Sequence, residues 1–163
     1  MKLDVSEALA HPGQEYPFSG SQAMADQEIG GDTIHFEDCA VRGVLMADDQ
    51  GDIAVRGEVS TVAHARCANC LAPAQAAVTN TFDEVFRRGG DPEDIEIFAY
   101  EGKEIDPDRL IMSYAIMALP IRFLCREDCP GFEYRDPDPA PEEPGVQHPF
   151  AGLSQLLDKD EEV

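Results

Sequence analysis

The sequence has few basic residues. It carries 12 lysines and arginines against 33 aspartates and glutamates, which gives a formal net charge of −21 at pH 7. A chain with this charge repels nucleic-acid phosphates at long range, which disfavours extensive direct contact with DNA or RNA. The same charge is compatible with a basic protein partner, and also with the simpler interpretation that acidity keeps the protein in solution.

The sequence also lacks long apolar runs. No stretch reaches the roughly 18 consecutive apolar residues that a membrane-spanning helix needs, so we expect no membrane partner. The first residues, Met1 to Glu7, lack the apolar core of a signal peptide. We therefore expect a cytoplasmic protein in a reducing compartment, where paired cysteines hold metal or do redox work more often than they form disulfides.

Catalytic motifs are scarce as well. No nucleophile elbow, phosphate-binding loop or paired acidic motif is present, and the four histidines are scattered along the chain. We predict an exposed position for His64 and a spacer role for His148. The sequence therefore predicts no catalytic residue, no enzyme activity and no small-molecule substrate. The histidines are His11, His35, His64 and His148.

Cysteine, in contrast, follows a pattern. Cys67 and Cys70 form a C-x2-C pair, and Cys125 and Cys129 form a C-x3-C pair further along the chain. We call these two segments the first and second cysteine knuckles. Four thiolates in two close pairs suit tetrahedral zinc, because each pair spans one edge of the tetrahedron. The sequence thus predicts a structural zinc site, with the fifth cysteine, Cys39, as a small buried residue.

The Cys67–Cys70 pair also leaves open an alternative function, that of a cytoplasmic thiol redox protein. A redox C-x2-C needs a thiolate of lowered pKa, which is typically provided by a helix N-terminus. Here Pro73 and a strand-like pattern follow the pair instead of a clear amphipathic helix. The pattern therefore favours metal binding over redox work.

Alternating apolar residues predict two hairpins. Ile34 and Phe36 occupy even positions, and Cys39 and Val41 then resume on odd positions, so the slip predicts a β-bulge. An acidic turn at 47–52 leads into the clearest strand, which we pair with the preceding one as a first hairpin. One face of that strand is apolar and carries Ile53, Val55, Val59, Thr61, Ala63, Ala65 and Cys67.

A second alternating run begins after the first knuckle. Val78, Phe82 and Phe86 form its apolar positions, the segment 87–92 breaks it, and 95–99 alternates again. We interpret this as a second hairpin with a return strand. A helix is then predicted from Pro107 to Ala118, with Asp106 as its N-cap, and it is apolar enough to be buried.

Together these patterns predict an α+β fold, an antiparallel sheet or partly closed barrel of two hairpins plus one buried helix. Residues 1–32 are expected to be weakly structured and 33–132 to form the domain. Residues 133–148 are predicted to be a disordered, acidic and proline-rich linker. Residues 149–163 are predicted to hold a docking motif on an acidic tail, with Phe150, Leu153 and Leu157 on one helical face. The sequence leaves open whether this motif docks on its own domain or on a partner.

Several segments, in this order, resemble the YceD family. Proteins of that family are associated with accumulation of the large-subunit (23S) ribosomal RNA, and their genes commonly neighbour one for a large-subunit ribosomal protein. The segments are Leu3-Asp4-Val5-Ser6 with Pro12-Gly13, Cys67-x-x-Cys70-Leu71, the helix from Ile105-Asp106 to Ala118-Leu119-Pro120, Cys125-x3-Cys129-x-Gly131, and Pro149-Phe150-Ala151-x-Leu153-x-x-Leu156.

The resemblance implies ribosome biogenesis and not a particular reaction. It implies a basic ribosomal protein or a pre-ribosomal particle as partner, with any RNA contact confined to a small basic focus. Many members have arginine where Asn69 stands, and many carry a further C-x2-C where this chain has Phe132-Glu133-Tyr134, so a metal here depends on four cysteines. The focus consists of Arg66, Arg87, Arg88, Arg122 and Arg126, and the three that flank the knuckles offset the charge of a four-thiolate zinc centre.

Overall fold

A long antiparallel hairpin forms the centre of the protein. In the computed structural model, which describes residues 1–91, 93–95 and 97–132, strand β6 (Ile53–Arg66) pairs with strand β7 (Pro73–Arg88) along its whole length. The register runs from Ile53 opposite Phe86 to Arg66 opposite Pro73. Alternate residues of both strands are buried, as the period of two in the sequence predicts.

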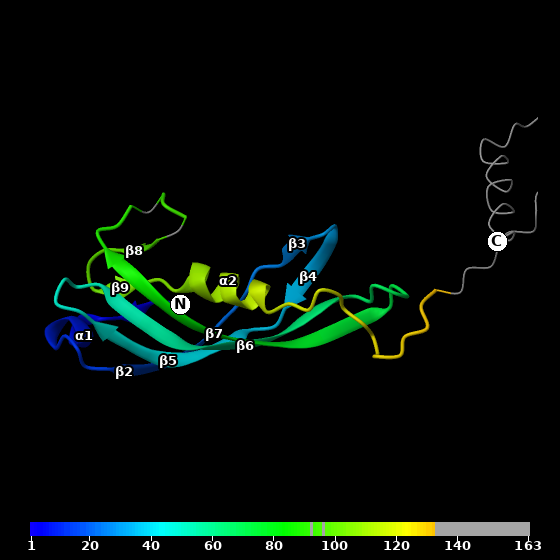
Figure 1. Ribbon diagram of the computed structural model, residues 1–163, viewed down its shortest axis with the longest axis horizontal. Coiled ribbons are helices and arrows are strands. Elements are labelled where there is room, and N and C mark those ends of the chain that lie inside the picture. The colour runs from blue at the N-terminus through cyan, green and yellow to red at the C-terminus, as the bar shows by residue number, and fades with distance from the viewer. Residues whose placement is uncertain (92, 96, 133–163) are drawn as a thin grey trace, which may run out of the picture. The chain divides into compact units, whose positions relative to one another are not determined.

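The other strands extend this hairpin into a mixed, mostly antiparallel sheet (Figure 1). Strand β5 (Cys39–Ala47) pairs with the first half of β6, and strand β2 (Tyr16–Gln22) pairs with β5. Strand β4 (Asp32–Phe36) continues along the same edge of β6, and β3 (Gln27–Ile29) pairs with β4. Among the described residues the sheet does not close, which excludes the partly closed barrel.

The first predicted hairpin and its bulge are confirmed. Strands β5 and β6 are joined by the acidic turn at 48–52, in which the carboxylate of Asp48 accepts backbone N–H bonds from Gln50 and Asp52. At the bulge, three residues (37–39) lie opposite only two (61–62), because Phe36 pairs with Ala63 and Ala40 with Ser60. This extra residue moves the buried positions from even to odd numbers.

The second predicted hairpin is wrong. The antiparallel partner of β7 is β6, and the return segment contributes only β8 (Phe98–Tyr100), which runs parallel to the end of β7. Ile95, at the start of the predicted return strand, is 87% exposed. The return strand is placed by long-range contacts instead: the hydroxyl of Tyr100 donates to the carbonyl of Gly51, and the Arg109 guanidinium lies over the Phe98 ring.

Helix α2 (Asp108–Met117) confirms the predicted helix and lies along one face of the sheet (Figure 1). The helix begins one residue later than predicted, with Pro107 and not Asp106 at the N-cap position, and the Asp106 carboxylate accepts the backbone N–H of Asp108 at 3.0 Å. Leu110, Ile111 and Ala115 are buried against the sheet. The helix is not buried all round, because Met117 is 63% exposed.

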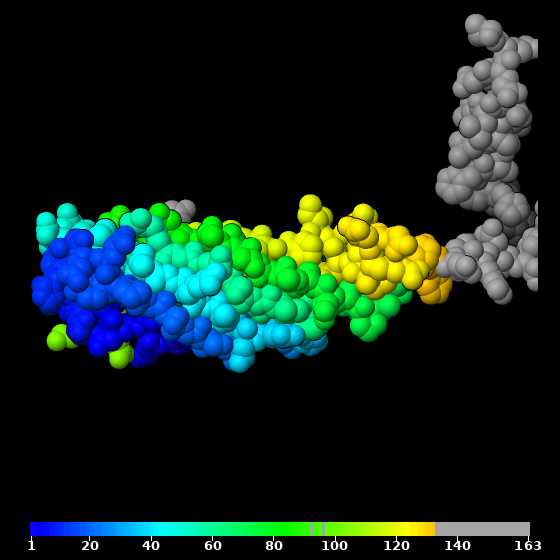
Figure 2. Space-filling view, turned by 90° about the horizontal axis from the view of Figure 1, so that it is seen from below, coloured from blue at the N-terminus to red at the C-terminus, as the bar shows by residue number. Residues whose placement is uncertain are grey.

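Residues 1–32, expected to be weakly structured, are part of the fold. They form β1 (Leu3–Asp4), the short helix α1 (Ser6–Ala10), β2 and β3, and β1 pairs with β9 (Glu104–Ile105) just before α2. Figure 2 shows these residues, in blue, against the strands of the sheet. Their alternation in the sequence is weak, because β2 is an edge strand and its inward positions are only half-buried.

The buried residues form two clusters of unequal size. The main cluster lies between the sheet, α1 and α2, and includes Val5, Cys39, Phe86, Ile105 and Leu110. The minor cluster lies at the end of the hairpin where β6 passes into β7. It contains six buried residues, Ile34, Ala63, Cys67, Ala74, Val78 and Phe123.

The predicted linker at 133–148 and the predicted docking motif at 149–163 lie outside the described residues. Within the described part of the chain, no helix is both long and apolar enough to cross a membrane.

Asp52 joins the β5–β6 turn to the end of β7 and provides a test of the fold. Its carboxylate accepts the backbone N–H of Arg88 at 3.0 Å and an Arg87 guanidinium N–H at 2.7 Å, and its side chain is 12% exposed. The bond from Arg88 is the main cause that holds the pKa of Asp52 below its usual range. We expect Asp52→Asn to lower the free energy of unfolding at pH 7 by about 1–2 kcal/mol.

The pH dependence of this difference follows from the direction of the shift. A carboxyl whose pKa is depressed by folding stabilises the protein above its unfolded pKa and loses that effect as pH falls through the folded value. The difference between wild type and Asp52→Asn, measured by urea unfolding, should therefore shrink below about pH 4. Asp49→Asn, in the same turn, is the control and should change little; an equal loss in both variants would contradict the role of Asp52.

Candidate metal centre

The first cysteine knuckle is the turn of the central hairpin. Between the last paired residues, Arg66 and Pro73, the Cys67 N–H donates to the Ala72 carbonyl at 2.8 Å, and the Leu71 N–H donates to the Cys67 carbonyl at 2.9 Å. This tight turn places Leu71 at φ +63°, and it is the one non-glycine residue of the described chain with a positive φ. Cys67 directly follows the last residue of β6, continues the inward-facing positions of that strand as predicted, and is fully buried.

The second knuckle reaches the same place from α2. After the helix, Phe123 is buried in the minor cluster, and its carbonyl accepts the Ala68 N–H at 2.8 Å. The Asn69 side chain adds a second link by donating to the Cys129 carbonyl at 3.3 Å. The segment that follows α2, drawn in yellow in Figure 1, thus lies at the tip of the β6–β7 hairpin.

These links bring all four predicted cysteines together. Their sulfur atoms lie within 4.8 Å of one another, with Cys67 and Cys129 sulfurs 3.7 Å apart and Cys70 and Cys125 sulfurs 3.6 Å apart. Zinc–sulfur bonds of about 2.3 Å in a tetrahedron place sulfurs about 3.8 Å apart. The donor set and its spacing therefore fit a tetrahedral, thiolate-preferring metal ion, and the predicted convergence of the two knuckles is confirmed.

The electrostatics of the cluster favour a cation. Backbone N–H groups point at the Cys67 sulfur, that of Cys125 first, and lower the pKa of this thiol to about 6. The neighbouring sulfurs, that of Cys129 first, raise the pKa of Cys125 to about 12. The four sulfurs thus share a space that cannot hold four negative charges by itself, and a bound divalent cation would allow all four to ionise.

The structure does not bring the five arginines of the predicted basic focus together. Arg87 and Arg88 lie at the opposite end of β7 from the knuckles. Near the knuckles, the Arg66 guanidinium lies 2.8 Å from the Asp32 carboxylate and that of Arg126 lies 3.5 Å from Asp128. For Arg122, no ion pair with another described residue is found. The focus is therefore smaller and more nearly neutral than the sequence indicated.

The structure gives the redox alternative no support. Cys67 has the lowered pKa that a redox thiol needs, but its side chain is fully buried in the minor cluster, and a disulfide partner has to reach the attacking sulfur. No helix begins at the knuckle, since β7 follows directly. Cys39 is fully buried in the main cluster, as predicted, and burial raises the pKa of its thiol.

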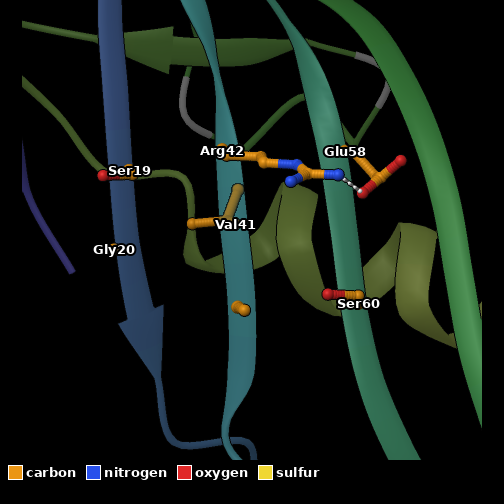
Figure 3. Close-up of a pocket in the computed structure, with 7 residues that line it drawn as sticks. Ser19, Gly20, Val41, Arg42, Glu58 and Ser60 are labelled. Atoms are coloured by element: carbon orange, nitrogen blue, oxygen red, sulfur yellow. Dashed lines mark hydrogen bonds and ion pairs between the residues drawn. The ribbon is translucent and has the colours of Figure 1, made fainter.

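Two other hollows in the described chain carry no comparable set of groups. One of about 440 Å³ lies on the face of the sheet away from α2, over β2, β5 and β6. Figure 3 shows Ser19 and Ser60 in it, beside Arg42 and Glu58, whose charged atoms pair at 2.8 Å. A hollow of about 250 Å³ beside the first knuckle is lined mostly by apolar residues, together with Asp32, Arg66 and Arg122. Neither brings together a nucleophile and a base.

The fold and the site together define a class: a protein with an antiparallel sheet, whose central hairpin carries half of a four-cysteine cluster that could hold a metal ion. A model of the family described as "Large ribosomal RNA subunit accumulation protein YceD" matches residues 55–157, which include both knuckles. The chain therefore belongs to the YceD family. Neither the curated proteins nor the solved structures gave a match.

Sequence reasoning missed two features of the site. Asn69 links the knuckles through its side chain, and Leu71 adopts a left-handed conformation. The sequence held no signal for the Asn69 link, because its partner lies on the second knuckle and only the fold brings the two together. For Leu71 there was a signal, because the residue that follows a tight C-x2-C turn has to reverse the chain.

Leu71 provides a test of this turn. A left-handed conformation costs an L-residue about 1–2 kcal/mol, and glycine avoids this cost although it loses more entropy on folding. Because the Leu71 side chain is 62% exposed, little burial is lost on its removal. We expect Leu71→Gly to leave the free energy of unfolding unchanged or to raise it by about 1 kcal/mol. Leu71→Val should lower it, since a β-branched residue fits this region worst. Equal urea-unfolding curves for both would contradict the strained turn.

The position of the metal centre predicts which part of the protein loses its structure when the metal is removed. We expect one zinc per chain by elemental analysis, and its removal by a chelator should open the minor cluster first, because only six buried residues hold that end together. Hydrogen exchange should rise at β4, at the tip of the β6–β7 hairpin and at residues 118–124. Amides of β5 and of the first half of β6 should stay protected.

Single substitutions test which cysteines bind the metal, with the buried Cys39 as the control. Cys125→Ser should release the metal and reproduce the exchange pattern of the metal-free protein. Cys39→Ala, the matched control, should keep the metal and lower stability by about 1 kcal/mol through the small cavity it leaves. Retention of one tightly bound metal by Cys125→Ser would contradict the four-cysteine site.

Proposed function

We propose that this protein is a non-enzymatic, zinc-stabilised factor in large ribosomal subunit biogenesis, which promotes accumulation of 23S ribosomal RNA by binding a ribosomal protein or pre-ribosomal RNA in the cytoplasm. The observation that carries the proposal is the family match over residues 55–157, which covers the hairpin tip and both cysteine pairs. The process comes from the family description, and the mode of action is inferred from the charge and the site.

Charge favours a basic protein as the direct partner. The chain has a formal net charge of −21, and most of the arginines on its sheet already pair with carboxylates. Arg42 pairs with Glu58, Arg66 with Asp32 and Arg87 with Asp52, so few cations remain to contact phosphates. Ribosomal proteins are basic because they bind RNA, and an acidic surface attracts them at long range.

The zinc would have a structural role in this proposal. The four cysteines lie between the hairpin tip and the segment after α2, and a metal there would hold both in place. The proposal assigns no reaction to the protein.

The proposal is tested by recovery of partners from a lysate. The full chain, used as bait at moderate salt, is expected to recover large-subunit ribosomal proteins, and ribosomal RNA is identified separately in the same eluate. If the direct partner is a basic protein, nuclease treatment should leave it bound, and high salt should release it because exposed charges are then screened.

Two controls make the result decisive. An unrelated protein of equal size and net charge shows how much recovery acidity alone produces, and a Cys70→Ser bait tests the redox alternative by trapping a mixed disulfide. Ribosomal components no more abundant than with the acidic control would overturn the proposal. A covalently trapped partner would establish the redox alternative in its place.

A further inference from the structure

Two histidines that are far apart in the sequence face each other across the sheet. His35 on β4 is the register partner of His64 on β6, immediately beyond the bulge. Glu37, two residues further on, donates its backbone N–H to the Val62 carbonyl, so the His35–His64 pair is also of the hydrogen-bonded kind, with Cα atoms about 5.5 Å apart. Both side chains point to the solvent face of the sheet.

Each imidazole is held by a carboxylate. The Nδ1 atom of His35 lies 2.8 Å from Oδ2 of Asp26, and Nε2 of His64 lies 2.9 Å from Oε1 of Glu37. The remaining ring nitrogens, Nε2 of His35 and Nδ1 of His64, have no hydrogen-bond partner among the described residues. A histidine with one nitrogen against a carboxylate and the other open is the arrangement found around metal ions, where the carboxylate fixes the orientation of the ring.

The two rings also line one hollow. Its volume is about 520 Å³, and Thr33, Ala65, Arg66, Leu71 and Pro73 complete its wall. The hollow is open to solvent, which leaves room for an ion with water molecules in its other coordination positions. The side chains of His35 and His64 are 60% and 40% exposed, so both remain accessible to an ion from solution.

We propose that His35 and His64 form a second metal site, which binds a divalent transition ion through two imidazole nitrogens and water. Nickel, copper and zinc are the ions that imidazole suits, while magnesium and calcium prefer oxygen ligands and are excluded. The site is separate from the four-cysteine centre and does not depend on the proposed function. A bound ion would join β4 to β6 just past the bulge, and by mass action it would stabilise the folded state.

The test uses the full chain with its cysteine centre loaded with zinc, so that added metal cannot occupy that centre. His148, which lies outside the described residues, is replaced in every sample by His148→Gln. Nickel is titrated by calorimetry, and its paramagnetic broadening of the histidine ring signals is followed by NMR. We expect one nickel per chain, with broadening of His35 and His64 and not of His11.

Substitutions show whether His35 and His64 bind the nickel ion. His35→Gln and His64→Gln should each weaken nickel binding by about tenfold or more, whereas His11→Gln, the matched control, should not change it. Asp26→Asn and Glu37→Gln should each weaken it by about tenfold to a hundredfold without removing a ligand, and Asp49→Asn should have no effect. Zinc content and circular dichroism confirm that each variant is folded.

The opposite outcomes overturn the proposal. If the protein binds no nickel beyond its zinc-loaded centre, the two histidines form surface ion pairs only. If nickel binds but neither His35→Gln nor His64→Gln weakens it, the ion occupies another place and the assignment is wrong. If the histidine variants weaken binding but the carboxylate variants do not, the part of the proposal that gives Asp26 and Glu37 an orienting role falls.

Discussion

The backbone ladder between β6 and β7 is the interaction on which the rest of this structure depends. It pairs every residue from Ile53 to Arg66 with one of β7, and every other layer is built on it. Strands β5 and β4 use the other edge of β6, and α2 packs across the face that the two strands share. Because the ladder ends at Pro73, its turn is also the first cysteine knuckle, and the position of two sulfurs is set by strand register.

The two hydrophobic clusters lie at different ends of this ladder and bury very different numbers of side chains. The main cluster buries large side chains from α2 and from most strands, with Ala8 from α1. The minor cluster has few buried residues, and its cysteines stand where more apolar side chains would otherwise be needed. A metal ion in the centre would supply this missing stabilisation, which is how small cores in other metal-binding folds are held.

The pairing of arginines with carboxylates decides which charges this protein leaves free for a partner. The solvent face of the sheet neutralises its arginines locally, as Arg42 with Glu58 and Arg66 with Asp32 illustrate, and the unpaired excess is acidic. Under the proposed function, this negative charge would attract a basic partner at long range. This distribution of charge is the reason for proposing a basic protein, and not RNA, as the direct partner.

The sequence by itself determined the elements with strong local periodicity: the β5–β6 hairpin with its bulge, helix α2, and the buried positions of β6 up to Cys67. It also predicted the four cysteines of the centre, because two close pairs of thiols suit the edges of a tetrahedral metal site. Only the tertiary structure decided that β8 runs parallel to β7, that residues 3–29 join the fold, and that His35 faces His64. These features depend on pairings between segments far apart in the chain, and local alternation carries no information about which strand a segment will meet.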